Sequence, residues 1–248
     1  IEDGQTIDTD IIRDIAADNI GALIWSKSME MNDMEKPDFL KNAMRNLSIP
    51  VITMEKYGFD CPGVDILFDY EKGGYMATRH LIECGHRRIG CVAGKQSFHV
   101  TMQRLNGYKK ALEESGISYD PDLVYFGDYT MESGYEAFSY ILGQKVTAIF
   151  SMNDEMAFGI YRAARLYGVS IPEDISIIGF DNVPFADVMQ VPLTTIGVPV
   201  IEMGKKLGEK VVDLIDNKEK LKEREEILYT PRLLVRGSTK SIPPVTVI

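Results

Sequence analysis

Short apolar segments alternate with amphipathic segments along most of this chain. The apolar segments are short and rich in β-branched residues, which indicates buried strands. They are Gly21–Trp25, Val51–Met54, Ile66–Phe68, Ile89–Ala93, Ala148–Phe150 and Ile175–Phe180. Between them, apolar residues recur at helical spacing, as in Ala77, Leu81 and Cys84, and we interpret these stripes as core. Four stripes are followed by glycines that suit left-handed helix ends: Gly85, Gly116, Gly143 and Gly168.

This alternation predicts an α/β protein with doubly wound, parallel sheets. Sheets of this type bind ligands beyond the carboxyl ends of their strands. Functional residues are therefore expected directly after the strands, at Trp25–Ser26, Glu55, Asp69, Gly94–His99, Ser151–Asp154 and Asp181–Asn182.

The end of the chain departs from this alternation of apolar and amphipathic segments. Val200–Ile215 has a helical apolar face and predicts one more helix. The charged stretch Asn217–Glu226 is interpreted as a solvated helix end and loop, and a final strand is expected over about Ile227–Val235.

Composition excludes several classes of protein. No apolar run reaches the roughly 18 residues that span a membrane, and Ile1–Asp10 lacks the basic start of a signal peptide. The formal charge of −10 argues against this segment gripping nucleic-acid phosphates itself. Three cysteines, Cys61, Cys84 and Cys91, fit no common zinc spacing and are interpreted as small buried residues in a reducing cytosol.

A series of motifs resembles the regulatory core of LacI/GalR-type transcription regulators. It begins with the continuous stretch Gly73–Gly90, which ends in Gly-His-Arg-Arg-Ile-Gly. Further matches follow in the order of the family: Arg104–Tyr108, Ser133–Tyr135, Thr147–Phe150, Asn153–Gly159, Ile171–Ser176, Gly179–Asn182, Pro192–Ile196 and Arg236–Thr239. One such motif would be a weak signal, whereas this many in order is a strong one.

The resemblance implies two similar lobes joined by three crossovers, as in type I periplasmic binding proteins. One lobe would hold residues 1–69 with 196–225, and the other 70–194 with 227–240. Ligand would bind between the lobes and favour their closure. Family members open with a DNA-binding headgroup, a hinge and a strand–helix–strand unit, and this chain begins near the end of that unit. DNA binding is therefore implied by the resemblance through a headgroup absent from this chain.

Three polar residues are expected to bind the ligand. Asp181 corresponds to the effector-binding aspartate of the family, and a carboxylate can accept hydrogen bonds from two vicinal hydroxyls; its alternative role is a helix cap. Arg104 opens its helix in the family's Arg-x-x-Gly pattern and offers a fork of donors, with a surface salt bridge as the alternative. Asn153 supplies a donor and an acceptor, whereas the neighbouring Asp154 could cap the next helix.

Five further residues complete the predicted site. Tyr129 stands where family members commonly carry an aromatic residue that stacks on the effector, and Phe98 lies in a loop that could line the pocket. In the first lobe, Glu55 and Asp69 end strands and face the predicted cleft, although Asp69 could serve the crossover instead. Trp25 lines the cleft or packs within its lobe.

These residues do not form a catalytic set, so no enzyme activity, cofactor or metal is expected. His86 matches a structural histidine of the family, and the spacing of His and Cys does not suit a metal. The segment Gly94–Ser97 lacks the ending of a phosphate-binding loop.

The expected function is the ligand-binding and dimerisation core of a cytoplasmic, sugar-responsive repressor that works as a homodimer. The alternatives are a periplasmic sugar-binding protein of a transporter and an enzyme of the doubly wound class. The acids, the arginine and the aromatic residues favour a neutral sugar, while a nucleobase stays open. The sequence does not say whether the effector releases DNA or promotes its binding.

Overall fold

A computed structural model describes residues 20–26, 49–59, 61–217 and 224–243, and the chain divides into two compact units. Unit 1 comprises Ile1–Phe68 and Pro199–Tyr229, and unit 2 comprises Asp69–Val198 and Thr230–Ile248. Within the described segments, the chain passes from one unit to the other after Phe68, after Val198 and after Tyr229. The segment Ile1–Asp10, which lacks the features of a signal peptide, and the centre of the charged stretch after Asn217 lie outside the described residues.

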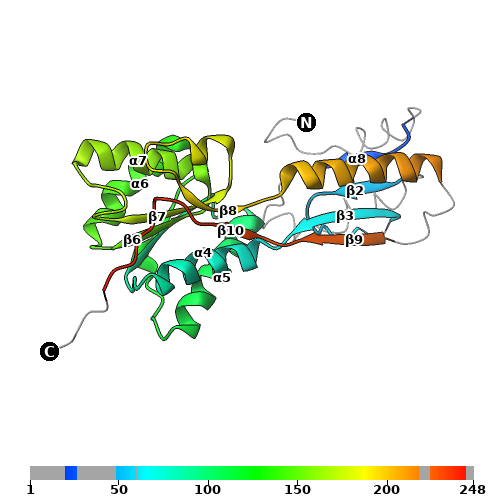
Figure 1. The fold of residues 1–248 in the computed structure, drawn as a ribbon. Coiled ribbons are helices and arrows are strands. Elements are labelled where there is room, and N and C mark those ends of the chain that lie inside the picture. The colour runs from blue at the N-terminus through cyan, green and yellow to red at the C-terminus, as the bar shows by residue number, and fades with distance from the viewer. Residues whose placement is uncertain (1–19, 27–48, 60, 218–223, 244–248) are drawn as a thin grey trace. The chain divides into compact units, whose positions relative to one another are not determined.

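Unit 1 contains a parallel sheet of the order β1-β2-β3-β9. Its strands are β1 (Leu23–Trp25), β2 (Val51–Thr53), β3 (Gly63–Phe68) and β9 (Arg224–Tyr229), and α8 (Val200–Asp216) runs along the sheet (Figure 1). Trp25, Val51, Phe59 and Cys61 form a small apolar cluster. A buried ion pair joins Asp65 of β3 to Arg224 of β9.

Unit 2 contains a six-stranded sheet of the order β10-β8-β7-β6-β4-β5. The strands are β4 (Ile89–Ala93), β5 (Val124–Phe126), β6 (Ala148–Ser151), β7 (Ser176–Asp181), β8 (Thr194–Gly197) and β10 (Arg232–Leu234). All pair in parallel except β10, which is antiparallel to β8. β4, β6 and most of β7 are buried throughout, as expected for strands covered on both faces.

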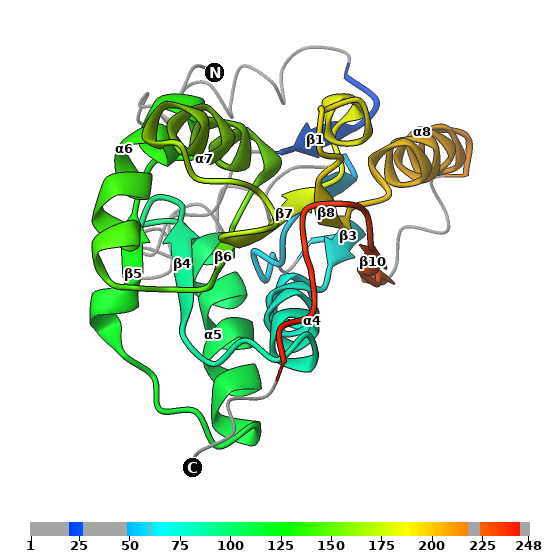
Figure 2. The same cartoon turned by 60° about the vertical axis from the view of Figure 1, so that its left-hand side comes forward.

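Two helix pairs cover the two faces of this sheet. The helices α4 (Tyr70–Glu83) and α5 (His99–Glu114) pack together on one face, and α6 (Met131–Gly143) and α7 (Asp154–Tyr167) pack on the other (Figures 1 and 2). Two short 3-10 helices, η1 (Pro121–Leu123) and η2 (Pro184–Asp187), lie in the connections. The predicted α/β fold with parallel sheets is confirmed.

The structure corrects several local predictions. Instead of one strand over Ile227–Val235 there are two, because β9 pairs with β3 in unit 1 and β10 pairs with β8 in unit 2. Residues 227–229, assigned to the C-terminal lobe from sequence, therefore belong to unit 1. The strand β9 also begins at Arg224, inside the stretch interpreted as loop. The strands β5 and β8 were not predicted from the sequence.

Three of the four expected left-handed glycines adopt a positive φ: Gly85, Gly116 and Gly168. Gly143 does not, since α6 continues through it and the positive φ falls at Lys145 (54°). The interpretation of Gly143 as a left-handed cap was wrong by two residues.

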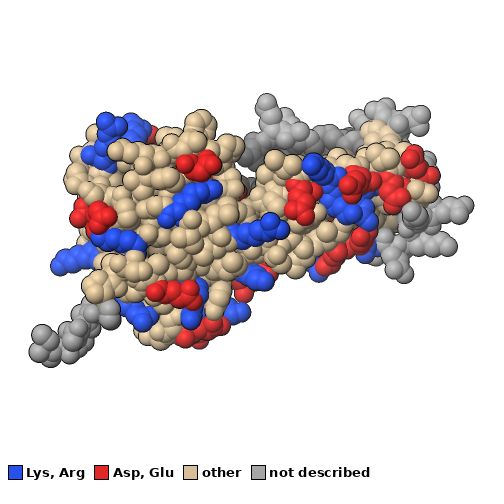
Figure 3. All heavy atoms as spheres, in the orientation of Figure 1, with Lys and Arg blue, Asp and Glu red and all other residues tan. Residues whose placement is uncertain are grey.

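The surface carries both signs of charge. On the face shown in Figure 3, acidic and basic side chains of the described residues are interspersed, without a continuous basic stripe. None of the helices in the described part of the chain has the length and apolar character needed to cross a membrane.

Candidate ligand-binding site

The carboxyl ends of three neighbouring strands of unit 2 bring predicted site residues to one edge of the sheet. Gly94 follows β4, Asn153 follows β6, and Asp181 ends β7. These strands are adjacent in the order β7-β6-β4, so the residues that follow them lie side by side although the sequence separates them widely.

Arg104 lies at the centre of this edge. It is in the second turn of α5, which begins at His99, so the prediction that Arg104 opens its helix was wrong. Its side chain is 8% exposed; Nη1 donates to the carbonyl of Met152, and Nη2 lies 3.4 Å from Oδ1 of Asp181. Burial of a guanidinium is costly unless it is paired, and here a carboxylate and a carbonyl compensate for it.

Aromatic rings surround the same guanidinium. Its Cζ lies 3.9 Å from the ring centre of Phe180, 5.0 Å from that of Tyr70 and 5.8 Å from that of Tyr129. Contacts of this kind attract a cation to the ring faces and contribute about 0.5–2 kcal/mol each. Nε of Arg104 is buried and has no hydrogen-bond partner among the described residues.

Asp181 has an unusual backbone and a half-buried side chain. Its φ is 107°, and φ of the next residue, Asn182, is 59°, both in the left-handed region that side chains disfavour. The side chain is 34% exposed, so one part of the carboxylate faces Arg104 while another part is open. Burial raises the pKa of Asp181, and the charge of Arg104 partly counters that rise. The alternative role as a helix cap has no support, because Asp181 ends a strand.

Tyr129 and Phe98 form an aromatic pair beside Arg104. Their ring centres are 6.2 Å apart with planes inclined by 26°. The Tyr129 hydroxyl shares a hydrogen bond with the Thr101 hydroxyl (2.7 Å), which fixes the ring. A Cβ on Gly94 would lie 2.0 Å from the Tyr129 ring, so only glycine leaves room for it. Phe98 immediately precedes α5 and is partly exposed.

Asn153 uses its amide within the protein. Its Oδ1 accepts from the backbone N–H of Met156 (2.9 Å), which caps α7, and its Nδ2 donates to the carbonyl of Tyr129 (2.8 Å). The suggestion that Asp154 caps this helix was wrong, because Asn153 is the cap. Asn153 therefore orders the site by holding the backbone of Tyr129.

The other three predicted residues do not lie in this group. Asp69 accepts from the backbone N–H of Lys72 (2.9 Å) and caps α4, a role that was not predicted for it from the sequence; it lies at the crossover, as its alternative placed it. Glu55 and Trp25 belong to unit 1. Trp25 is 8% exposed and packs edge-on against Tyr57, with ring centres 6.2 Å apart, as in the alternative of packing within the lobe.

Sequence reasoning missed three residues of this region: Tyr70, Phe180 and Thr101. The buried Asp154 was expected among the residues after its strand, but only with a helix cap as its role. Phe180 was assigned only to a buried strand. One signal was available for it, since Gly73 lies in the first motif and a Cβ there would come within 2.6 Å of the Phe180 ring. The sequence by itself does not reveal which ring a glycine accommodates.

His86 has a structural environment. His86 is buried and bonds the hydroxyls of Thr147 (2.9 Å) and Ser176 (3.1 Å) through its two ring nitrogens. Burial lowers the pKa of His86, so the ring is neutral at pH 7. Among the described residues, no group of three or more His, Cys, Asp or Glu side chains is placed to hold a metal ion.

Comparison with known proteins finds relatives that are similar to this chain in sequence and in fold. The model of the periplasmic binding protein-like domain matches residues 78–239. The transcriptional repressor PurR of Photobacterium profundum is 36% identical over 208 residues, which cover 83% of this chain and 61% of that protein. The transcriptional regulator DegA of Bacillus subtilis is 36% identical over 178 residues, covering 71% of this chain and 52% of DegA. The chain thus spans about three fifths or less of the length of these relatives.

Two solved structures illustrate the structural likeness. A complex of the regulator CelR with cellobiose has a TM-score of 0.78 and 29% identity, covering 92% of this chain and 69% of that one. A LacI family regulator from Enterococcus faecium with bound ribose has a TM-score of 0.71 and 29% identity, covering 85% and 86%.

Proposed function

This chain belongs to the periplasmic-binding-protein-like domain family, within the group of LacI-family regulators, and we propose that it is the sugar-binding core of a transcriptional repressor. In this proposal, a small ligand binds at the edge formed by Asp181, Arg104 and Tyr129 and alters the DNA affinity of a helix-turn-helix headgroup elsewhere in the full-length protein. The ligand must bind one conformation of the protein better than another for this to work.

The observation that carries the proposal is the paired arrangement of Arg104 and Asp181 within a ring of aromatic side chains. Arg104 is held in place by Met152 and Phe180, and Asp181 keeps a third of its side chain open. A preorganised donor and an open acceptor suit a ring that carries several hydroxyls, while Tyr129 and Phe98 offer apolar faces for its C–H side. Ribose and cellobiose complexes among the structural relatives support a sugar.

Asn153 enters the proposal as the residue that orders Tyr129, with one amide hydrogen left for ligand. The roles predicted for Glu55, Asp69 and Trp25 remain predictions. Glu55 and Trp25 belong to the other unit, and Asp69 already caps a helix.

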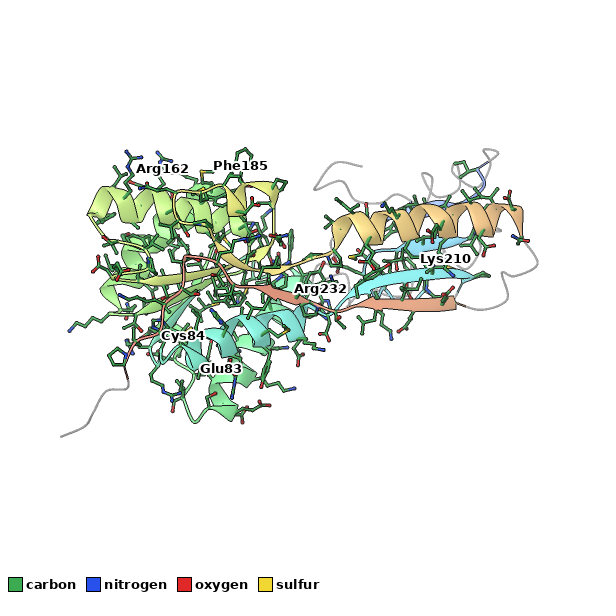
Figure 4. The ribbon with its side chains drawn as sticks, in the orientation of Figure 1. Glu83, Cys84, Arg162, Phe185, Lys210 and Arg232 are labelled. Atoms are coloured by element: carbon green, nitrogen blue, oxygen red, sulfur yellow. The ribbon has the colours of Figure 1, made fainter. Side chains whose placement is uncertain are left out.

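The proposal includes a cytoplasmic homodimer, because a repressor that reads two DNA half-sites needs two headgroups. Unit 2 offers an apolar surface for such contact. Phe185 of η2 is 69% exposed, and the nearby Val188 and Leu166 are similarly open. They belong to or adjoin a groove of about 1360 Å³ between α7 and the segment after β7. Phe185 and Arg162 both point outward there (Figure 4). We expect Phe185→Asp to weaken dimerisation in sedimentation experiments.

A thermal-shift screen tests the ligand. The chain is screened against pentoses, hexoses, disaccharides, sugar phosphates and nucleobases, in parallel with Asp181→Ala. A ligand at a hundredfold excess over its Kd stabilises the folded state by about 2.7 kcal/mol, a shift of roughly 5–10 °C for a protein of this size. The matched control is Asp122→Ala, which removes an exposed carboxylate in η1, away from the site.

A sugar that shifts the wild type and the control variant but not Asp181→Ala supports the proposal and identifies the effector. If a nucleobase gives the same pattern of shifts, the proposed site is supported but the proposed class of ligand, a sugar, is wrong. A sugar that shifts Asp181→Ala as strongly as the wild type contradicts the site.

The alternative of a periplasmic transport protein is separated by the full-length N-terminus, which would carry a signal peptide instead of a headgroup. The relatives of this chain reported above are transcriptional regulators, which favours the repressor hypothesis over the transport protein.

A further inference from the structure

Asp154 lies beneath the site and is not among the ligand contacts proposed above. It is the first residue of α7, and its side chain is fully buried. Its Oδ1 accepts from the hydroxyl of Thr195 in β8 (2.6 Å), and its Oδ2 accepts from the backbone N–H of Val183 (2.9 Å). One carboxylate therefore joins the start of α7 to a neighbouring strand and to the segment that leaves Asp181.

That segment is strained. Asp181 and Asn182 are consecutive left-handed residues, and neither is glycine. Such a turn persists only when surrounding contacts compensate for its backbone energy. The Asn182 side chain accepts from Nη2 of Arg236 (2.7 Å), and the amide of the next residue, Val183, is bonded by Asp154. The turn is thus held on both sides directly after Asp181.

The space for this carboxylate is built into the sequence. Gly179 lies two residues before Asp181 in β7, and a Cβ there would come within 2.2 Å of Oδ1 of Asp154. Any larger residue would displace the carboxylate from the turn. The absence of a side chain at Gly179 therefore provides the space that the Asp154 carboxylate occupies.

We propose that Asp154 is a positioning residue for the ligand site: by accepting the Val183 amide, it holds the left-handed turn in which Asp181 faces Arg104, and its ionisation adjusts that orientation. The proposal rests on the proposed role of Asp181 as the ligand's acceptor. It adds to the site a residue, Asp154, that does not contact the ligand. It also makes the orientation of Asp181 depend on pH.

The pKa of Asp154 lies close to neutral pH, so its charge changes in the pH range where the protein can be studied folded. Burial raises its pKa to about 6, hydrogen bonds from Thr195 and Val183 oppose that rise, and the negative charge of Asp181 adds to it. Three other charged or titratable groups lie nearby. Tyr161 on α7 stays neutral, because burial raises its own pKa. Arg236 bonds Asn182 in the turn, and Arg104 pairs with Asp181. An ionised carboxylate accepts an amide more strongly than a carboxylic acid does, so the turn is held more firmly above pH 6.

The test uses NMR on the isotopically labelled chain without ligand, so that it is independent of the ligand screen. Two quantities are measured: the titration of the Asp181 carboxyl carbon between pH 4 and pH 8, and the exchange rate of the Val183 amide. The variants are Asp154→Asn, Asp154→Ala and the matched control Thr195→Val. This control removes the hydrogen bond between Asp154 and β8 but leaves the hydrogen bond between Asp154 and the Val183 amide.

We expect the wild-type Asp181 carboxyl to show an inflection near pH 6 caused by Asp154. Asp154→Asn should lose this inflection yet keep the Val183 amide protected, because its carbonyl oxygen can still accept that amide. Asp154→Ala should raise Val183 exchange by about tenfold or more relative to core amides of β7. Thr195→Val should retain both the inflection and the protection, even if it is less stable.

The proposal is overturned if Asp154→Ala leaves Val183 exchange unchanged, if Thr195→Val raises it equally, or if the inflection persists in Asp154→Asn. Should Asp154→Ala not fold, the comparison of Asp154→Asn with Thr195→Val decides through the inflection. If no ligand is ever found, these readouts still stand, so the two proposals fail separately.

Discussion

Replacing Arg104 with methionine tests whether the site is preorganised by its arginine. Methionine has a similar length and fills the space between the rings of Phe180 and Tyr70 without a charge. The change removes the hydrogen bond to the Met152 carbonyl, the cation–π contacts and the ion pair with Asp181.

The magnitude follows from the burial of each partner. A buried carbonyl left without a donor costs about 1–3 kcal/mol. Loss of the desolvated contact with Phe180 costs about 1–2 kcal/mol. The ion pair adds less than about 1 kcal/mol, because the Asp181 side chain is 34% exposed and the atoms are 3.4 Å apart. Allowing for the apolar contacts that methionine makes, we expect the free energy of unfolding to fall by about 2–4 kcal/mol.

Urea unfolding measures this change in the unit concerned. Far-UV circular dichroism reports mainly on unit 2, which holds four of the five described α-helices. The chain's one tryptophan, Trp25, lies in unit 1 and serves as an internal reference. The midpoint by circular dichroism should shift more than the midpoint by tryptophan fluorescence. Asp181→Asn, the matched change to the exposed partner, should cost less than about 1 kcal/mol.

A loss below about 0.5 kcal/mol in Arg104→Met would refute the reasoning, since it would mean that the buried guanidinium contributes no net stabilisation. An equally large loss in Asp181→Asn would also contradict it. In that case the ion pair, rather than the carbonyl and the rings, would hold the arginine.

Three further predictions concern residues around the site. The folded pKa of Asp154 is raised from 3.8 to about 6, so its contribution to stability is fully present below pH 3.8 and is lost as the pH rises through 6. Asp154→Asn cannot ionise at this position. Its unfolding free energy relative to wild type should therefore rise by about 2 kcal/mol between pH 4 and pH 7 in denaturant titrations, at about 1.4 kcal/mol per pKa unit; a constant difference would contradict this. Gly94→Ala should displace the Tyr129 ring, cost about 1–3 kcal/mol and reduce ligand affinity, as calorimetry with the identified effector would show; unchanged affinity would argue against Tyr129 as a ligand contact. The pKa of His86 is lowered by burial, so its contribution is present above its ordinary pKa of 6.5 and is lost as the pH falls through the folded value. His86→Leu should reduce stability at pH 7 by about 2–4 kcal/mol and flatten the remaining acid dependence, and a melting temperature equal to that of wild type at pH 7 would contradict it.

Most of the fold could be predicted from periodicity. Buried parallel strands need continuous apolar residues, so β4, β6 and β7 are visible in the sequence as short runs. The strands β5 and β8 carry no such signal: β5 has an exposed residue, and β8 contains two threonines. The division of the last strand between two units depends on pairing partners far away in the chain, which local pattern does not record.

The candidate site, like the fold, could be predicted from the sequence only in part. Asp181, Asn153 and Phe98 could be found because residues after parallel strands are exposed at one edge of the sheet. Their individual roles could not, since two of the predicted ligand residues, Asn153 and Asp69, use their side chains to cap helices. Capping depends on where a helix begins to within one residue, and sequence patterns locate helix ends less closely than that.

The sequence by itself determined the class of fold, the family and the edge of the sheet where ligand chemistry belongs, because strand and helix periods and the residues at strand ends are local properties. Only the tertiary structure decided that Arg104 meets Asp181, 77 residues away, inside a ring of aromatic side chains. It likewise decided that Asp154 supports the turn beneath them. Such contacts arise from the packing of α5 and α7 on opposite faces of one sheet, and their energies come from burial, which no single stretch of sequence contains.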